Sequence, residues 1–296
     1  MSVTVRPRRS ALYMPASKER ALEKARGLAA DVLLMDLEDA VAPAEKDTAR
    51  AQLGVAITTG GYAPREVAVR VNGLGTPWYD DDLRAAATMG ADAVLLPKVE
   101  SSAMVDQVAW ALDAAGAPAS LPLWAMIETP AGVLAATEIA GHPRMTCLVL
   151  GTNDLLADLK ARYRADRAAL MPALAQTVLA ARTHGCAVLD GVYNAFKDED
   201  GLRAEAEQGR DLGMDGKTLI HPAQLAIANA VFGPTEDAIA TARAEVQAFE
   251  RAEAQGEGVA VVEGKIVENL HAAAARRLIA EAEAIAALEE SLKEGA

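Results

Sequence analysis

The sequence predicts an α/β protein built on a TIM (β/α)8 barrel, followed by a C-terminal extension of helices and a hairpin. Three observations support this fold class. Eight short apolar runs each end in a polar or charged residue. Ala-rich stretches of helical character separate most of the runs, and strands that alternate with helices pair in parallel. The runs are continuously apolar, which is typical of strands covered on both faces.

The eight predicted strands span ~220 residues, close to what a barrel of eight units needs. Helices are expected between them, for example over 17–29 and 165–183. An open, doubly wound sheet is the main alternative, but its first strand should be followed by a Gly-rich phosphate-binding turn, and residues 16–20 read Ala-Ser-Lys-Glu-Arg. The predicted strands are Ser10–Pro15, Val32–Glu38, Val67–Asn72, Ala93–Lys98, Leu123–Glu128, Cys147–Asp154, Ala187–Asp190 and Lys217–His221.

The pattern changes after Phe232, so we expect residues 1–233 to form the catalytic barrel domain and 234–296 a separate extension. A helix is predicted over 235–255, a hairpin over 259–267 that turns at Glu263-Gly264, and a last helix from about residue 269. Such a segment is too small to hold a core alone. We therefore expect it to pack on the barrel or on a neighbouring subunit, as a lid and oligomerisation element.

Composition limits the possible partners. The chain has 29 Lys and Arg against 42 Asp and Glu, a net charge of −13, which argues against binding to nucleic acid or anionic membranes. No apolar run approaches the ~20 residues of a membrane span, and the basic start lacks the apolar core of a secretory signal. Cys147 and Cys186 each begin an apolar run and are expected to be buried thiols in a reducing compartment. We expect a soluble, cytoplasmic protein that binds small molecules.

A net negative charge does not exclude a phosphate-bearing ligand, which needs only a local basic patch. The N-terminal region offers one. It consists of Arg6, Arg8, Arg9, Lys18, Arg20, Lys24 and Arg26.

Active sites of such barrels lie at the C-terminal ends of the strands. Glu128 and Asp154 end consecutive predicted strands, so their carboxylates are expected to converge. Two oxygen ligands without Cys or His nearby suit a hard cation that keeps several waters, Mg²⁺ first and Mn²⁺ next. The alternative is that each acid caps a helix or pairs with a Lys. The strand-end residues are Asp36, Glu38, Asp39, Arg70, Asn72, Lys98, Glu100, Glu128, Asp154, Asp190 and His221.

Arg70 is the complementary charge among these residues. Its fork can bind a carboxylate or a developing oxyanion through two hydrogen bonds. The alternative is an ion pair with Glu38 or Asp36 that only holds the rim together. Asp36 and Glu38 have the same strand parity and face the same side, so we assign them the supporting role of fixing Arg70.

Seven segments, in this order, resemble the citrate lyase β-subunit-like (HpcH/HpaI) family, which also holds malyl-CoA, β-methylmalyl-CoA and citramalyl-CoA lyases. The resemblance runs from about Arg9 to Gln224 and implies a TIM barrel that forms homotrimers or hexamers. The segments are RSALYMP, ADVLLMDLEDAVAPAEKDTAR, VRVNGLGT, LLPKVE, IETPAG, GTNDL and GMDGKTLIHPAQ.

The resemblance also implies roles for individual residues. Glu128 and Asp154 match the Mg²⁺ ligands of the family, and Arg70 matches the arginine that contacts the bound oxo-acid and the thioester enolate. Tyr13, Lys18 and Lys24 match positions that hold coenzyme A.

The chain departs from the lyases at one position in its tail. The lyases carry a Gly-Lys-Met-Ile-Asp-like stretch whose Asp exchanges a proton in a neighbouring subunit's site. Here the stretch reads GKIVENLH, so Glu268 stands where Asp is expected. The longer side chain shifts the carboxylate, and a misplacement on the order of 1 Å can cost ~10²-fold in rate.

These features lead to the expectation of a Mg²⁺-dependent acyl-CoA lyase that cleaves malyl-CoA or citramalyl-CoA into acetyl-CoA and a 2-oxo acid. One alternative is a thioesterase on the same substrates, with water activated by the metal or by Glu268. Others are a citrate lyase β subunit that acts on citryl-acyl carrier protein, and a non-catalytic family member kept as a scaffold.

Overall fold

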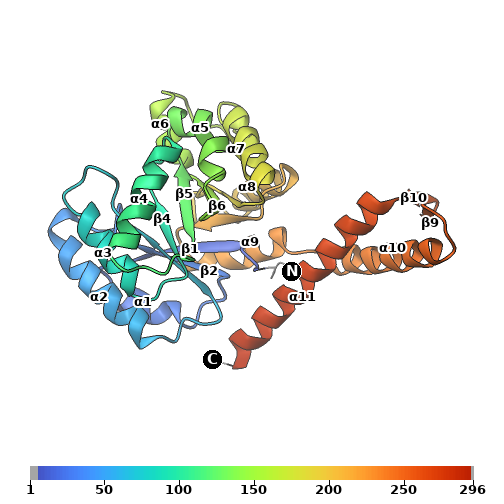
Figure 1. Cartoon of the computed structure of the whole chain (residues 1–296), viewed down its shortest axis with the longest axis horizontal. Coiled ribbons are helices and arrows are strands. Elements are labelled where there is room, and N and C mark those ends of the chain that lie inside the picture. The colour runs from blue at the N-terminus through green and yellow to red at the C-terminus, as the bar shows by residue number, and fades with distance from the viewer. Residues whose placement is uncertain (1–5, 295–296) are drawn as a thin grey trace. The chain divides into compact units, whose positions relative to one another are not determined.

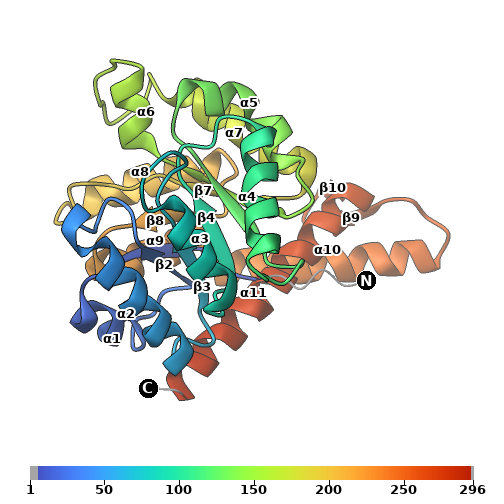
Figure 2. The ribbon, with the colours of Figure 1, turned by 60° about the vertical axis from the view of Figure 1, so that its left-hand side comes forward.

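The computed structural model describes residues 6–294, and its core is a closed barrel of eight parallel strands in the order β1 to β8. Helices lie outside the strands around the barrel (Figures 1 and 2). The fold class predicted from the sequence is therefore confirmed. The chain divides into two compact units, the barrel of residues 8–232 and a second unit that contains residues 233–294.

The strands of the barrel are short and lie close to their predicted positions. They are β1 Ser10–Pro15, β2 Val32–Asp36, β3 Glu66–Arg70, β4 Ala93–Leu96, β5 Leu123–Ile127, β6 Met145–Leu150, β7 Ala187–Asp190 and β8 Gly216–Leu219. The helices of this unit are α1 Glu19–Ala25, η1 Pro43–Glu45, α2 Lys46–Thr59, α3 Tyr79–Thr88, α4 Ser102–Ala114, α5 Pro130–Ala140, α6 Thr152–Asp158, α7 Met171–His184, α8 Glu199–Asp211, η2 Pro222–Gln224 and α9 Leu225–Phe232.

Side-chain alternation along the strands gives the barrel two separate apolar layers. On β2, Val32 and Leu34 belong to a small cluster with Trp124 and Cys147, whereas Leu33 and Met35 belong to the large cluster shared with the helices. The small cluster fills the inside of the barrel. The same alternation carries the next inward-facing residue of each strand to the C-terminal end of the barrel.

Several predicted strands and helices are longer than the observed ones. The predicted strand 147–154 stops at Leu150, because Gly151 begins a turn and Asp154 lies in the first turn of the short helix α6, which was not predicted. The predicted helix 165–183 begins only at Met171, since Arg167 adopts a left-handed backbone with φ of 51°.

The second unit follows its predicted outline. It contains α10 Glu236–Ala254, the hairpin of β9 Ala260–Val262 and β10 Lys265–Val267, and α11 Asn269–Glu294. The hydroxyl of Thr235 caps α10 by accepting from the N–H of Ala238. Glu263 and Gly264 have positive φ angles of 50° and 76°, as a two-residue hairpin turn requires.

The unit has a small core of its own, formed by Phe249, Ala252, Ala260, Val267 and Ala272. Among residues 6–294, no helix has the length and apolar character to cross a membrane.

Candidate active site

A cavity of about 300 Å³ opens at the C-terminal ends of the barrel strands. Tyr13, Asp36, Arg70 and Met126 line it and form the uppermost inward-facing layer of β1, β2, β3 and β5. Glu128, Gly151 and Asp154 line it from the connections that follow β5 and β6. Strand parity thus places Asp36, Arg70 and Glu128 at this cavity, and the first turn of α6 brings Asp154 to it.

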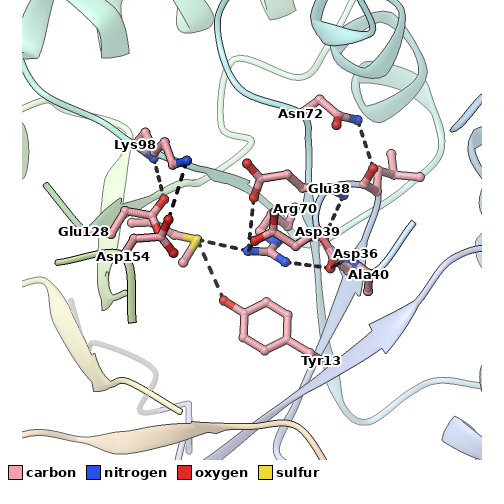
Figure 3. Close-up of polar contacts among 12 residues, drawn as sticks. Tyr13, Asp36, Glu38, Asp39, Ala40, Arg70, Asn72, Lys98, Glu128 and Asp154 are labelled. Carbon is pink, nitrogen blue, oxygen red and sulfur yellow. Dashed lines mark hydrogen bonds and ion pairs between the residues drawn. The ribbon is translucent and has the colours of Figure 1, made fainter. Parts of the chain in front are cut away.

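Arg70 is the central cation of this cavity. It is almost fully buried and binds Asp36 with both prongs of its fork, Nε to Oδ1 at 2.7 Å and Nη2 to Oδ2 at 2.6 Å. Its remaining nitrogen, Nη1, lies 3.0 Å from Glu38 and 3.4 Å from Asp39. The guanidinium also stacks over the ring of Tyr13 at 4.7 Å. Figure 3 shows Arg70 between these acids and Tyr13.

The carboxylate of Asp36 also accepts the backbone N–H groups of Glu38 and Ala40, at 2.8 and 3.0 Å. Both of its oxygens are therefore hydrogen-bonded, and it fixes two of the three nitrogens of Arg70. Both Asp36 and Glu38 contact Arg70, which is the geometry that a supporting role requires.

The electrostatics of the cavity favour a protonated carboxyl at Glu38. Burial raises the pKa of Glu38 to about 8, although the charge of Arg70 acts in the opposite direction. Burial, together with the acids around it, also holds the pKa of Tyr13 well above its usual value, although the charge of Arg70 lowers it. Tyr13 therefore stays a neutral phenol, and its hydroxyl points to the sulfur of Met126 at 3.8 Å.

The two predicted metal ligands lie beside each other, together with Lys98 (Figure 3). The N–H of Lys98 donates to Oε1 of Glu128 at 2.7 Å, and its ammonium lies 3.5 Å from Oδ1 of Asp154. Lys98 adopts a left-handed backbone with φ of 49°, a conformation that is costly for a non-glycine residue and recurs at functional sites. Glu128 does not cap the next helix, since Thr129 is the N-cap of α5.

Burial raises the pKa of Glu128 to about 7, and the nearby charge of Asp154 adds to the rise. Two acids in close proximity without a full counter-charge favour binding of a cation. Gly151 is needed here, because a Cβ at that position would overlap the Cβ and Oε2 of Glu128.

The donor set fits a hard cation that takes few protein ligands. Within residues 6–294, no cluster of three or more His, Cys, Asp or Glu side chains is placed to hold a metal ion. Two carboxylates beside an open cavity leave coordination positions for water and for substrate oxygens, as Mg²⁺ prefers. Cys147 and Cys186 are buried free thiols outside the cavity lining.

A second polar network, which the sequence did not indicate, supports the β2 and β3 ends. The buried ammonium of Lys46 donates to the carbonyls of Leu37 and Glu38 and to Asn72, at 2.7–2.8 Å. Asn72 in turn donates to Leu37 and to Asp82. Asn72 thus holds the loop that carries Glu38 rather than pointing into the cavity.

Asp190 does not line the cavity, although its position at the end of a strand predicted that it would. Its carboxylate is fully buried and accepts from Lys217 at 2.9 Å and from Arg167 at 2.7 and 2.8 Å. Lys217 also donates to Glu205 at 2.8 Å. Alternation along β7 and β8 directs Asp190 and Lys217 outward, toward α8 and the segment before α7.

The predicted basic patch is not a single surface. Arg8 forms a two-pronged pair with Glu66, and Arg9 binds Asp31. These pairs lie at the N-terminal ends of the strands, opposite to the cavity, so Arg8 and Arg9 do not form one basic patch with Lys18 and Lys24. Arg26 likewise donates to the carbonyl of Gly60.

Other predicted residues lie outside the cavity lining. Lys18 directly precedes α1, with 60% of its side chain exposed and its ammonium 3.8 Å from Glu45. Lys24 and Glu100 are exposed, and His221 caps η2. Glu268 belongs to the other unit, where it ends the hairpin at the start of α11 and is exposed.

Comparisons with known proteins agree with this geometry. The profile of the HpcH/HpaI aldolase/citrate lyase family matches residues 9–222. A (3S)-malyl-CoA thioesterase of Cereibacter sphaeroides is 58% identical over 98% of this chain and 100% of its own length. An L-malyl-CoA/β-methylmalyl-CoA lyase of the same species is 36% identical over 95% of this chain and 96% of its own.

Among solved structures, the CitE protein of Mycobacterium tuberculosis in complex with magnesium, acetoacetate and coenzyme A is similar. Its TM-score is 0.76 at 29% identity, over 95% of this chain and 100% of that one. The barrel, the strand-end residues and the sequence match together show that this chain belongs to the HpcH/HpaI aldolase/citrate lyase family.

Proposed function

We propose that the protein is a Mg²⁺-dependent thioesterase that hydrolyses a malyl-CoA-type thioester to CoA and the free hydroxy acid. The observation that carries this proposal is the 58% identity, over nearly the whole chain, to a (3S)-malyl-CoA thioesterase. A lyase, the function expected from the sequence, is the second candidate, because the relative that is a malyl-CoA lyase is 36% identical to this chain.

The cavity has the groups that a substrate with two acid functions needs. Glu128 and Asp154 would hold the Mg²⁺ ion. When bound, that ion supplies Lewis-acid polarisation and a template for the hydroxyl and carboxylate oxygens of the acid.

Arg70 stabilises negative charge that develops on the thioester carbonyl oxygen. Asp36 keeps the guanidinium in place through its two-pronged bond. The Nη1 atom, which lies 3.0 Å from Glu38, is the one available to substrate. Because the pKa of Glu38 is raised to about 8, a neutral Glu38 does not compete strongly for that nitrogen at neutral pH.

Glu268 is the proposed proton acceptor for the attacking water. The oxygen of that water forms a bond to the thioester carbon, its proton passes to the carboxylate, and the C–S bond breaks to release the CoA thiolate, which then takes a proton. We further propose that Glu268 acts in the site of a neighbouring subunit. Exposed Val261, Ile266 and Leu270 beside it are suited to pack against another chain.

The coenzyme A portion is proposed to extend from the cavity toward α1, where Lys18 and Lys24 are exposed. Lys18 directly precedes α1, just after the C-terminal end of β1. A homotrimer or hexamer is the proposed assembly, from the family resemblance.

The products of malyl-CoA distinguish the candidate functions. The protein is incubated with malyl-CoA, with Mg²⁺ or with EDTA, and free thiol, malate, acetyl-CoA and glyoxylate are measured. Malate and CoA in equal amounts, dependent on Mg²⁺, are expected. Acetyl-CoA and glyoxylate would instead identify a lyase, and turnover of neither kind would identify a non-catalytic member or an enzyme for an acyl carrier protein.

A matched pair of variants tests the role of Glu268 in that choice. We expect Glu268→Gln to abolish hydrolysis and Glu268→Asp to raise the share of acetyl-CoA among the products, because Asp restores the residue of the lyases. If Glu268→Gln keeps wild-type hydrolysis, Glu268 is not the proton acceptor.

A further inference from the structure

A second cavity, of about 230 Å³, adjoins the first within the barrel unit and has no part in the chemistry above. It exceeds the ~150 Å³ of a protein cavity that accommodates benzene. It lies between the segment after β6 and the loop after β7. Its own lining consists of Leu156, Tyr163, Arg167, Leu170, Tyr193, Ala195 and Glu205.

Four residues line both cavities and therefore form the partition between them, Thr152 and Asn153 from one side and Val192 and Asn194 from the other. The inner part of this partition is fixed, because Thr152 packs so closely on Gly191 that a Cβ there would overlap its hydroxyl.

The outer part of the partition is a pair of exposed amides. Nδ2 of Asn194 donates to Oδ1 of Asn153 at 2.8 Å, and Nδ2 of Asn153 donates back at 3.3 Å. A typical hydrogen bond contributes only about 0.5–1.5 kcal/mol net, and both side chains are exposed to water that can replace the partner. This part can therefore open at low cost, and its two side chains are the ones that stand between the cavities on the outer side.

The second cavity has charged residues in its wall but offers no unpaired charge. The Nη1 atom of Arg167 binds both oxygens of Asp190, at 2.7 and 2.8 Å. Glu205 accepts from Lys217 at 2.8 Å and from Tyr163 at 2.9 Å. With these charges paired, the leucine, valine and tyrosine surfaces set the character of the cavity, which suits an apolar group.

We propose that the second cavity is a subsite for an apolar substituent on the hydroxyl-bearing carbon of the acyl substrate, and that the Asn153–Asn194 pair limits the size of that substituent. Asn153 directly precedes Asp154, one of the two acids that would hold the metal, so the partition stands next to the position of that carbon. This inference rests on the proposed function, because it requires the acid end of the substrate to occupy the first cavity.

Binding of 2-oxo acids tests the subsite without any thioester chemistry. The full-length protein in Mg²⁺ is titrated calorimetrically with glyoxylate, which has no substituent, and with 4-methyl-2-oxopentanoate, which carries an isobutyl group. We expect Asn194→Ala to raise the ratio of the affinity for 4-methyl-2-oxopentanoate to the affinity for glyoxylate by about tenfold. A well-filled apolar pocket discriminates by that order between ligands with and without an apolar group.

A second substitution shows whether the gain comes from the cavity. Ala195→Leu, added to Asn194→Ala, fills the second cavity and should remove the gain. The matched control is Ala169→Leu in the same background, because Ala169 is exposed and lines neither cavity. An equal effect of Asn194→Ala on both acids, a gain that survives Ala195→Leu, or binding of neither acid would overturn the inference.

The failures of the two proposals are distinguishable. Hydrolysis of malyl-CoA without the gain in isobutyl-acid affinity overturns the subsite alone. The gain without any thioester cleavage overturns the proposed function alone.

Discussion

At the scale of single residues, the site depends on side chains whose charges are only partly compensated. Arg70 faces three acids, and Glu128 shares its surroundings with Asp154. Because burial raises the pKa of Glu38 and of Glu128 in the folded protein, the protonation of both side chains is coupled to folding.

The raised pKa of Glu38 predicts a specific dependence of stability on pH. The folded pKa of about 8 lies above the ordinary value of 4.5, so the folded protein holds a proton that the unfolded chain releases between these values. Stability then falls as pH rises through this window, by at most about 1.4 kcal/mol per pH unit for this group. Urea unfolding at pH 5, 6, 7 and 8 should show a steeper fall for the wild type than for Glu38→Gln. Parallel curves would contradict the assignment.

Gly151→Ala tests the close contact that positions Glu128. The added Cβ would overlap the Glu128 side chain, so we expect Mg²⁺ affinity, measured by calorimetry, to fall by about tenfold or more. Gly54→Ala is the matched control, because Gly54 lies within α2 with open space around it and Ala there should stabilise the helix by roughly 0.5–1 kcal/mol. Unchanged metal affinity in Gly151→Ala would show that Glu128 is not held in this way.

The residues whose position at the cavity could be predicted from the sequence lie where strand periodicity alone fixes the direction of a side chain. Asp36 and Arg70 continue the inward parity of β2 and β3, and this brings them into one layer. Lys46 and Asp82 were missed because their roles depend on contacts with Asn72, which lies 26 and 10 residues away along the chain. Contacts between side chains that lie so far apart along the chain leave no local pattern in the sequence.

At the scale of elements, the strands could be predicted because each is a continuous apolar run. The ends of the strands could not, since the chain leaves β6 at Gly151 and continues directly into α6, whose first turn contains Asp154. Asp190 shows the same limit. Its position at the end of β7 suggested the cavity, but parity directs it to Arg167 and Lys217.

The buried charges that join β7, β8 and α8 predict a large effect of one substitution. Lys217 is fully buried and donates to Asp190, Glu205 and the carbonyl of Gly191. Lys217→Met removes one of the two cations that compensate Asp190 and the donor to Oε1 of Glu205 and to the carbonyl of Gly191. It should destabilise the protein by about 3–5 kcal/mol, measured by urea unfolding. Arg84→Met, which removes an exposed cation on α3, should change stability by less than about 1 kcal/mol. Similar effects of the two variants would show that the network contributes little.

At the scale of the whole molecule, the barrel pattern of the sequence ends at Phe232, where the chain divides into its two compact units, and a helix cap follows at Thr235. The sequence could not indicate which surfaces meet, since contacts between chains leave no periodic trace. The arrangement in which Glu268 serves a neighbouring subunit is therefore a prediction that needs its own test.

Mixed assembly tests that arrangement directly. Arg70→Met and Glu268→Gln should each be inactive in malyl-CoA hydrolysis. When the two variants are unfolded together and refolded, roughly a quarter of wild-type activity should return, because random assembly brings an intact barrel and an intact extension together in some sites. Refolding each variant alone is the control. No recovery in the mixture, with assembly confirmed by gel filtration, would contradict action across subunits.

The central claim is that Glu128 and Asp154 share one divalent cation beside Arg70. Electron paramagnetic resonance of Mn²⁺ titrated into the protein measures this most directly. We predict one tight site that Mg²⁺ displaces, and a loss of affinity of at least about tenfold in both Glu128→Gln and Asp154→Asn. Asp39→Asn, which changes a more exposed carboxylate of the same cavity, should leave it unchanged. Equal Mn²⁺ affinity in all four proteins would contradict the account.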